Sequence, residues 1–503
     1  MKWTDPVFAG APTGRFTHLA VLLLSAAAVS CAPPAVTVPA PVPLPKAFSA
    51  NGADPLPARW WTAFDDAGLD AVIDRALREN FSLRTAWDRL AQARAAAAAS
   101  GAPLWPALNG SAGASRTVQR TPLTGRTYTN QVSLGLAASY EVDLWGRIRS
   151  THDATRLDVE ARREDLRAAA ISLTADIAST WYLLAEQREQ SKLLGEQIQT
   201  NEKVLAIITM KFRRGQASAT DVLQQRQLVE STRGERVQVA SVLAVLEHLL
   251  DVLSGRRPGS GAPAGPAALP TLGAVPATGV PAEWVRRRPD VRAAEVRAAA
   301  ADRRVAAAIA EQFPRLALSA GADTSAERLR DVFDNWLANL AANLTAPLFD
   351  AGLRAAEVER TRAVVSERLN AYGAAVLAGL QEVEDALTRE ARQVEYVESL
   401  RKQLDLSNKA VAQTLDDYTK TGRDFTRYLT TLLSHQRLER TYLTARRQRV
   451  DDRIDLCRAL STGWTLEAPD RAEVSGPRGP LKPPAEDPQK PAPPPGGAQP
   501  PQP

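Results

Sequence analysis

The stretch Tyr140-Glu-Val-Asp-Leu-Trp-Gly-Arg-Ile-Arg149 joins an alternating, strand-like run to a long proline-free block, and it has a counterpart later in the chain. That counterpart is Leu344-Thr-Ala-Pro-Leu-Phe-Asp-Ala-Gly-Leu-Arg354, in which Arg354 lies 207 residues after Arg147. Gly215 and Gly422 share this offset. Solenoid repeats have shorter periods, roughly 20–50 residues. The offset therefore indicates a duplicated domain, and one structure should explain both halves.

The hydrophobic pattern before each junction has a period of two, which is typical of a β-strand. Even-numbered positions are apolar from Val132 to Leu144 and again from Trp336 to Ala346. A weaker partner strand is expected in each half, over residues 108–118 and 316–323, and residues 120–126 are expected to form a polar loop. Each alternating run approaches the roughly 9–11 residues of a transmembrane β-strand.

The blocks that follow the junctions contain no proline, from Leu123 to Arg257 and from Leu348 to Ala468. Both are rich in Ala, Leu, Glu, Gln and Arg, which favour helix, and each is interrupted by one glycine-centred turn. Each block is predicted to be a helical hairpin whose first arm, about residues 147–214 in the first copy, reaches roughly 100 Å. A shorter helix is expected before each strand pair, at about residues 69–100 and 282–311.

The number of predicted strands constrains the assembly. One chain offers four strands, whereas the smallest membrane barrels have about eight. An open sheet edge in lipid leaves backbone groups unsatisfied at several kcal/mol each. Closure with other copies is therefore expected, and three copies give twelve strands around a pore. The alternative is a soluble α+β protein with surface hairpins.

The ends of the chain are set apart by composition. Residues 1–30 resemble a signal peptide, and Cys31 follows small residues in a lipobox-like context, so it is the predicted lipidation site. An ordinary secretion signal with an incidental cysteine is the alternative. The expected organisation is a tether over residues 31–58, a first repeat over 59–255, a linker over 256–281, a second repeat over 282–466 and a proline-rich tail over 467–503.

The charges and the reactive residues argue against several functions. The 62 basic and 57 acidic residues are nearly balanced and interleaved, so no nucleic-acid partner is expected. Four scattered histidines show no metal-ligand spacing, and no phosphate-binding loop is present, so neither a cofactor nor an enzymatic activity is expected. Cys457, in an apolar helical run, is predicted to pack as a small hydrophobic residue.

Several motifs together resemble the outer membrane factor family, the TolC/OprM/NodT-like efflux channels. The most specific is Trp284-Val-Arg-Arg-Arg-Pro-Asp-Val-Arg-Ala-Ala-Glu295, followed by Phe313-Pro314. The two junctions, Gln381 to Leu387 and Leu456 to Trp464 also match, so the resemblance covers about residues 59–466. It implies an α+β membrane protein that forms a homotrimer, with a 12-stranded β-barrel in the outer membrane lipid and a periplasmic α-helical tunnel of coiled-coil hairpins.

The resemblance also implies partners and a function. Such a trimer is a passive conduit that exports small molecules or drugs from an inner-membrane pump, here expected to be of the RND type, through a periplasmic adaptor protein. Lipid anchoring at Cys31 would hold it at the outer membrane. The alternatives are an outer membrane channel for type I protein secretion and a non-conducting periplasmic coiled-coil scaffold lipoprotein.

The hairpin turns supply the candidate site residues. Hairpin ends point away from a barrel, so Arg214, Gly215, Gln216 and Gly422 are candidate adaptor contacts. Asp221, Arg423, Asp424 and Arg427 are candidate gate residues at the periplasmic tip, with a solvated charge as the alternative for Asp424. The resemblance is weakest here, because residues 428–436 lack the Asp that family members often carry in their gate. At the junctions, Arg147 and Arg354 are expected either to bond nearby groups or to be solvated.

Overall fold

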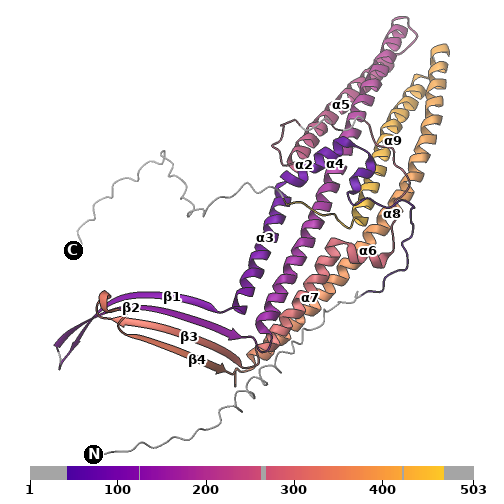
Figure 1. The fold of residues 1–503 in the computed structure, drawn as a ribbon. Coiled ribbons are helices and arrows are strands. Elements are labelled where there is room, and N and C mark those ends of the chain that lie inside the picture. Colours follow the sequence, from indigo (N-terminus) through magenta and orange to yellow (C-terminus); the bar gives the residue numbers. More distant parts are fainter. Residues whose placement is uncertain (1–41, 124, 262–264, 266–267, 422–423, 469–503) are drawn as a thin grey trace, which may run out of the picture. The chain divides into compact units, whose positions relative to one another are not determined.

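The computed structural model of the protein describes residues 42–123, 125–261, 265, 268–421 and 424–468 (Figure 1). The chain divides into two units, Met1–Leu466 and Glu467–Pro503, and the elements below belong to the first. The predicted signal peptide, Cys31, nearly all of the proline-rich tail, Gly422 and Arg423 lie outside the described residues.

Four antiparallel strands form one sheet in the order β1-β2-β3-β4. Their bounds are Ala107–Thr121, Gly125–Val142, Arg315–Ala326 and Trp336–Thr345. The predicted strands are present, and β1, β2 and β3 extend beyond the predicted ranges. The prediction of a polar loop over residues 120–126 is wrong, because Arg120 pairs with Arg126 and Thr121 with Gly125 in the ladder. The polar side chains there extend a hairpin rather than end it.

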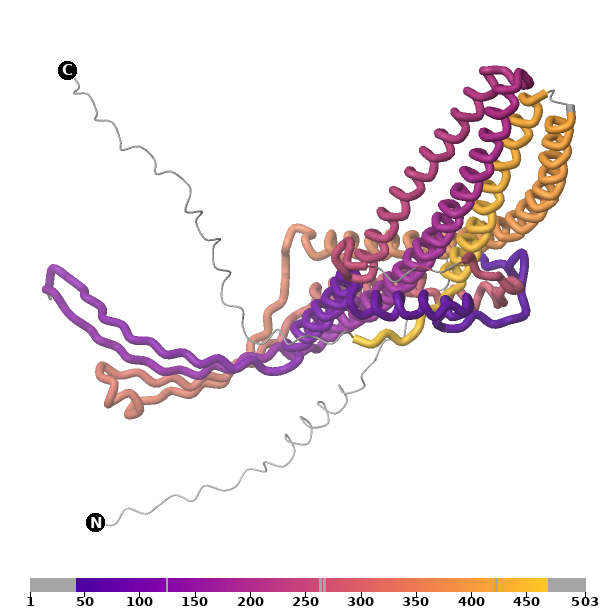
Figure 2. The backbone as a smooth tube through the Cα atoms, turned by 90° about the horizontal axis from the view of Figure 1, so that it is seen from above, coloured from indigo at the N-terminus to yellow at the C-terminus, as the bar shows by residue number. Residues whose placement is uncertain are grey.

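Two long helical hairpins follow the strand pairs, as predicted. The first consists of α4 (Arg147–Arg213) and α5 (Ala219–Leu253), and the second of α8 (Leu353–Thr421) and α9 (Phe425–Leu460). The 67 residues of α4 correspond to roughly 100 Å of helix. The two hairpins lie side by side, with their tips at the same end and away from the sheet (Figures 1 and 2).

The shorter helices differ from the prediction, because each is broken. The first is split into α2 (Ala67–Glu79) and α3 (Phe81–Gly101) at Asn80, whose backbone is extended. Its side chain accepts a hydrogen bond from the Leu83 amide at 2.9 Å and donates to the Leu253 carbonyl at 2.9 Å. Asn80 therefore caps α3 and satisfies the end of α5, which stabilises the break.

The second short helix is split into α6 (Pro281–Arg287) and α7 (Pro289–Ala310). Proline excludes the preceding residue from the helical region, and Arg288 is accordingly extended, with ψ of 122°. Three short 3-10 turns complete the described elements: Trp60–Phe64, Ala102–Leu104 and Leu329–Asp331.

The helices α3, α4, α7 and α8 pack in that order as one layer, and three apolar cores hold the unit together. The largest surrounds α4 and includes Trp60, Trp61 and Trp181; a second joins α6, α8 and the end of α9. A third lies at the hairpin tips. Among the described helices, α4 alone has a stretch long and apolar enough to cross a membrane, and most of that stretch is buried within the protein.

Candidate functional site

The first hairpin tip is a compact turn with well-satisfied backbone groups. Gly215 has φ of 72°, a conformation that glycine adopts without strain, and the Gln216 amide donates to the Lys211 carbonyl at 2.9 Å. Ser218 and Asp221 then form a reciprocal capping box, in which each side chain accepts from the other residue's amide, at 3.1 and 2.9 Å. Arg214, Gly215 and Gln216 are exposed in this turn.

The second tip begins its returning helix differently. Asp424 occupies the N-cap of α9 with φ of 70°, and its side chain makes no capping hydrogen bond. Its carbonyl accepts from the amides of Arg427 and Tyr428 at 3.1 and 3.3 Å. The left-handed conformation is costly for most residues and is tolerated by aspartate. The side chains of Asp424 and Arg427 are both exposed.

An aromatic cluster joins the two tips behind these turns. Tyr418 stacks on Tyr428 with 6.3 Å between ring centroids, and Phe425 lies 5.5 Å from Tyr418. The same core contains apolar side chains of the first hairpin: Val204, Ile208 and Val222. Burial raises the pKa of Tyr418, and the Asp221 carboxylate adds to the increase. The first-hairpin residue Asp221 therefore lies near the second hairpin.

Lys211 makes a direct polar bridge between the tips. Its ammonium group donates to the Tyr418 carbonyl at 2.9 Å and lies 4.3 Å from the centroid of that ring. The acceptor is a carbonyl near the C-terminal end of α8, where the helix dipole favours a positive charge. One cation thus binds the end of α4 to the end of α8.

A buried polar network lies further from the tips than the aromatic cluster. The sequence analysis did not predict it. Asn201 is fully buried and exchanges two hydrogen bonds with Gln436, at 2.9 and 3.4 Å. It also donates to the Thr232 hydroxyl at 3.3 Å, and its backbone carbonyl accepts from Gln225 at 2.9 Å. The network connects α4, α5 and α9. Polar residues on an otherwise apolar helix face are the signal that could have revealed it.

The two junctions repeat one capping device. Asp143 accepts hydrogen bonds from the first amides of α4, at Ile148 and Arg149, at 3.0 and 2.9 Å. Asp350, which lies 207 residues later, accepts from the Arg354 amide at 3.3 Å. Carboxylates at helix N-termini are favoured by the helix dipole. The duplication has therefore preserved a cap at the point where each strand becomes a helix.

The junction arginines are paired rather than solvated. Arg147 forms a bidentate ion pair with Glu141, in which Nε donates to Oε1 at 3.2 Å and Nη2 donates to Oε2 at 2.9 Å. Arg354 pairs with Asp350 at 2.8 Å, and this hydrogen bond holds the pKa of Asp350 below its usual value. Trp145 links the halves, because it stacks on Phe313 and donates to the Pro314 carbonyl at 2.7 Å.

The described residues offer no group of three or more His, Cys, Asp or Glu side chains that could hold a metal ion. Cys457 is only 2% exposed in the core around α4, where burial raises the pKa of its thiol to about 12. The buried thiol has the small hydrophobic role predicted for it.

Residues 72–256 and 280–462 match the family described as outer membrane efflux protein. The pyoverdine export outer membrane protein OpmQ of Pseudomonas aeruginosa is 31% identical over 425 residues, covering 81% of this chain and 87% of OpmQ. The outer membrane protein OprJ of the same species is 30% identical over 414 residues, covering 80% and 86%. The chain belongs to the outer membrane efflux protein family.

Solved structures of outer membrane channels share the fold. The outer-membrane channel OprN has a TM-score of 0.79 and 26% identity, covering 85% of this chain and 98% of OprN. The open state of the MtrE outer membrane channel of Neisseria gonorrhoeae has a TM-score of 0.75 and 26% identity, covering 84% and 96%. The helix-rich chain with one small antiparallel sheet is thus the fold of this channel family.

The state of Cys457 gives a first testable prediction. A thiol with a pKa of about 12 is almost entirely protonated near pH 8, and the thiolate is the reactive form. In a Cys31→Ser background, the native protein should therefore resist a maleimide reagent and react once denatured. A Ser241→Cys variant, with an exposed site on α5, is the matched control and should react in the native state. Native labelling of Cys457 at the rate of the control would contradict the structure.

Proposed function

We propose that the protein is the outer membrane channel of a tripartite efflux system. The observation that carries this proposal is the four-stranded sheet, in which β1 pairs only with β2 and β4 only with β3 among the described residues, so that each leaves one edge open. Leu340 and Leu344 of β4 lie on one face of it and are exposed, at 84% and 68%. A sheet with two open edges and exposed leucines is unstable alone in lipid or in water.

An assembly of three copies would pair the open sheet edges and would place the exposed leucines in lipid. Joining β4 of one copy to β1 of the next closes twelve strands, satisfies the edge backbone groups and turns the leucines toward lipid. The helical layers of the three copies would then close into a periplasmic tunnel that continues from the end of the barrel. Membership of the efflux family supports this assembly.

The tips are the proposed contact with the adaptor and the place of the gate. The turn of Arg214, Gly215 and Gln216 is exposed in the described chain, which leaves it accessible to a partner. Gly422, which lies outside the described residues, is proposed as a contact because it follows Gly215 at the 207-residue offset. Asp221, Arg423, Asp424 and Arg427 remain the proposed gate residues. Lys211 and the aromatic cluster support this role, because they hold the two hairpins together where an opening movement would separate them.

The proposed cargo is small molecules, delivered by an inner-membrane pump of the RND type. The names of relatives support this class, since OpmQ is described by pyoverdine export and TtgI of Pseudomonas putida by toluene efflux. The channel does no chemistry of its own in this scheme. The runner-up, a non-conducting scaffold, does not account for the sheet with two open edges.

Conductance tests the proposed function. The purified trimer in a planar bilayer should give single-channel steps, and the dissociated monomer should give none. In an Asp424→Ala, Arg427→Ala variant the steps should be larger or more frequent if these charges close the tip. A stable trimer that shows no conductance, either as wild type or as the double variant, would contradict the channel proposal and favour the scaffold.

Lipid anchoring at Cys31 is proposed separately. Cells grown with radiolabelled palmitate should incorporate the label into the wild-type protein, since a lipobox cysteine is the acylated residue. A Cys31→Ser variant should lose the label, whereas Cys457→Ser should keep it and serves as the matched control. Label retained by Cys31→Ser would refute the assignment.

A further inference from the structure

We propose that a cavity in the helical layer binds a small multivalent anion through a set of arginines. The cavity has a volume of about 780 Å³, within the usual range for small-molecule sites. Every helix of the layer contributes to its lining: Arg89 from α3, Arg162 from α4, Arg297 and Arg304 from α7, and Arg368 from α8. Because it spans all four helices, the cavity lies on a face of the layer and not at an edge.

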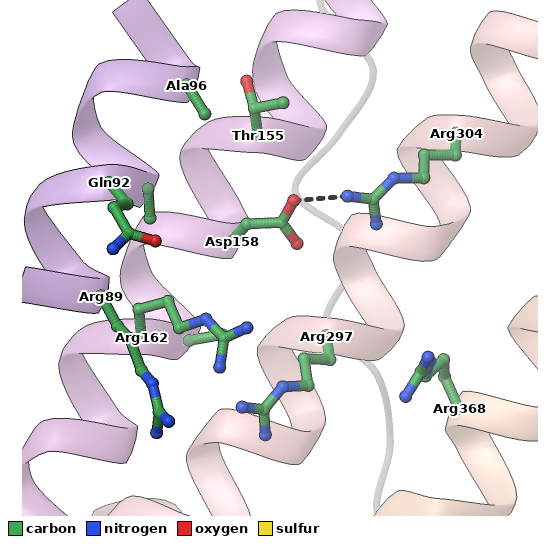
Figure 3. A pocket seen from close by; sticks show the side chains of 11 residues that line it. Arg89, Gln92, Ala96, Thr155, Asp158, Arg162, Arg297, Arg304 and Arg368 are labelled. Carbon is green, nitrogen blue, oxygen red and sulfur yellow. Dashed lines mark hydrogen bonds and ion pairs between the residues drawn. The ribbon is translucent and has the colours of Figure 1, made fainter. Parts of the chain in front are cut away.

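Alanine side chains leave the space of the cavity, and arginine side chains give it a positive charge. Ala93, Ala96 and Ala161 line the cavity, and their short side chains leave room between the helices. Figure 3 shows Arg162 and Arg297 extending toward each other across this room, with Arg89 on one side and Arg368 on the other. Gln92 and Thr155 add neutral hydrogen-bonding groups.

The arginines that line the cavity outnumber the carboxylates that pair with them. Arg304 pairs with Asp158, while Arg297 and Arg162 share Asp165. Arg368 has only a 3.8 Å contact with its neighbour Glu367. Arg89 lines the cavity and has no recorded hydrogen bond or ion pair within the described residues. Five guanidinium groups thus face three carboxylates, which leaves a surplus of two positive charges.

This arrangement favours a particular ligand class. Guanidinium groups bind carboxylates and phosphates with directional, charge-assisted hydrogen bonds. Like charges held around one cavity repel one another, and an anion with two or more charges relieves that repulsion at several arginines at once. The ligand we infer is a small organic anion that carries several carboxylate or phosphate groups. That such an anion is exported cargo rests on the proposed function; the binding site itself does not.

The test measures binding of citrate and of inorganic pyrophosphate to the full-length trimer in detergent, by isothermal titration calorimetry. Both should bind, and raising the ionic strength from about 0.1 M to about 1 M should weaken both, because charge screening shortens from about 10 Å to about 3 Å. Spermidine, a polycation, should not bind at this site.

The variant is Arg89→Gln with Arg368→Gln, chosen because neither arginine joins α4 to α7. It should keep the fold and weaken citrate binding about tenfold or more, since two charge-assisted contacts are lost. The matched control is Arg94→Gln with Arg156→Gln, which removes two exposed arginines that do not line the cavity. Equal binding by the two double variants would overturn the proposal.

Absence of binding by the wild-type trimer would also overturn it, as expected if carboxylates of a neighbouring subunit fill the cavity. Conductance recorded on the same preparation separates the two proposals. A conducting trimer without anion binding refutes the site alone, whereas a silent trimer that binds citrate refutes the channel alone.

Discussion

Replacing Arg453 with methionine should lower the free energy of unfolding by about 3–5 kcal/mol, the usual cost of leaving one buried charge without its partner. Arg453 on α9 is 8% exposed and Glu390 on α8 is 2% exposed. The Arg453 Nε donates to Glu390 Oε1 at 2.8 Å, and a second nitrogen of the same guanidinium contacts this oxygen. The substitution therefore strands a carboxylate inside the second hairpin.

The effect should extend to the segment that connects the two repeats. Arg453 also donates to the carbonyls of Ala274 and Gly273, at 3.0 and 3.1 Å. One side chain thus holds the linker against the second hairpin. Faster proteolysis in the linker should accompany the loss of stability.

Guanidinium denaturation of the detergent-solubilised protein measures this prediction. The matched control is Arg401→Met, which breaks an exposed two-contact pair with Glu398 on the same hairpin. Exposed pairs contribute about 0–1 kcal/mol, so the control should stay close to wild type. Adding Glu390→Leu to Arg453→Met should recover part of the loss, because no buried charge then remains. Equal midpoints for Arg453→Met and Arg401→Met would show that the pair is not buried in the assembled protein.

Replacing Asn201 with leucine should loosen the hairpin tips at a cost of about 2–4 kcal/mol. The substitution removes the partner of both amide atoms of Gln436 and a donor to Thr232, whose hydroxyl keeps its bond to the Leu228 carbonyl. Each stranded buried group of Gln436 costs about 1–3 kcal/mol. Both partners are buried, so water cannot readily replace the lost bonds. Contacts of α4 with α5 and α9 should weaken together.

Hydrogen exchange of the amides in residues 425–440 measures the loosening. Gln403→Leu is the control, since Gln403 is exposed and, within the described part of the chain, bonds to Ser399 one turn away on α8 and to no other side chain. Exchange near the tip should accelerate in Asn201→Leu and remain unchanged in Gln403→Leu. If the tip is the gate, single-channel openings should also become more frequent; unchanged exchange would mean that the network does not hold the tip.

Much of the fold could be predicted because the repeat and the two hydrophobic periods agree. The period of two before Arg147 and Arg354 predicts strands, and the proline-free blocks after them predict hairpins, which the structure confirms. Asn80 caps α3 locally, but the break was not predicted, because its other bond goes to the Leu253 carbonyl 173 residues away. Only tertiary contact reveals why the helix ends there.

The candidate site was predicted less well than the fold. Turn positions such as Gly215 follow from local sequence, and Ser218-Ala-Thr-Asp221 contains a recognisable capping pattern that explains why Asp221 stands there. The Asn201 network and the role of Lys211 depend on which helix faces are brought together. One sequence does not contain that pairing in any local pattern.

The unequal starts of the two returning helices have a temporal consequence. The first copy begins α5 with a capping box, whereas the second begins α9 at a left-handed Asp424 without a side-chain cap. The start of α9 should therefore unravel before that of α5. In a trimer, the three hairpin ends of the second copy would then move before the three of the first copy. The order of movement at the tip would be set by the copy of the duplication from which each end comes.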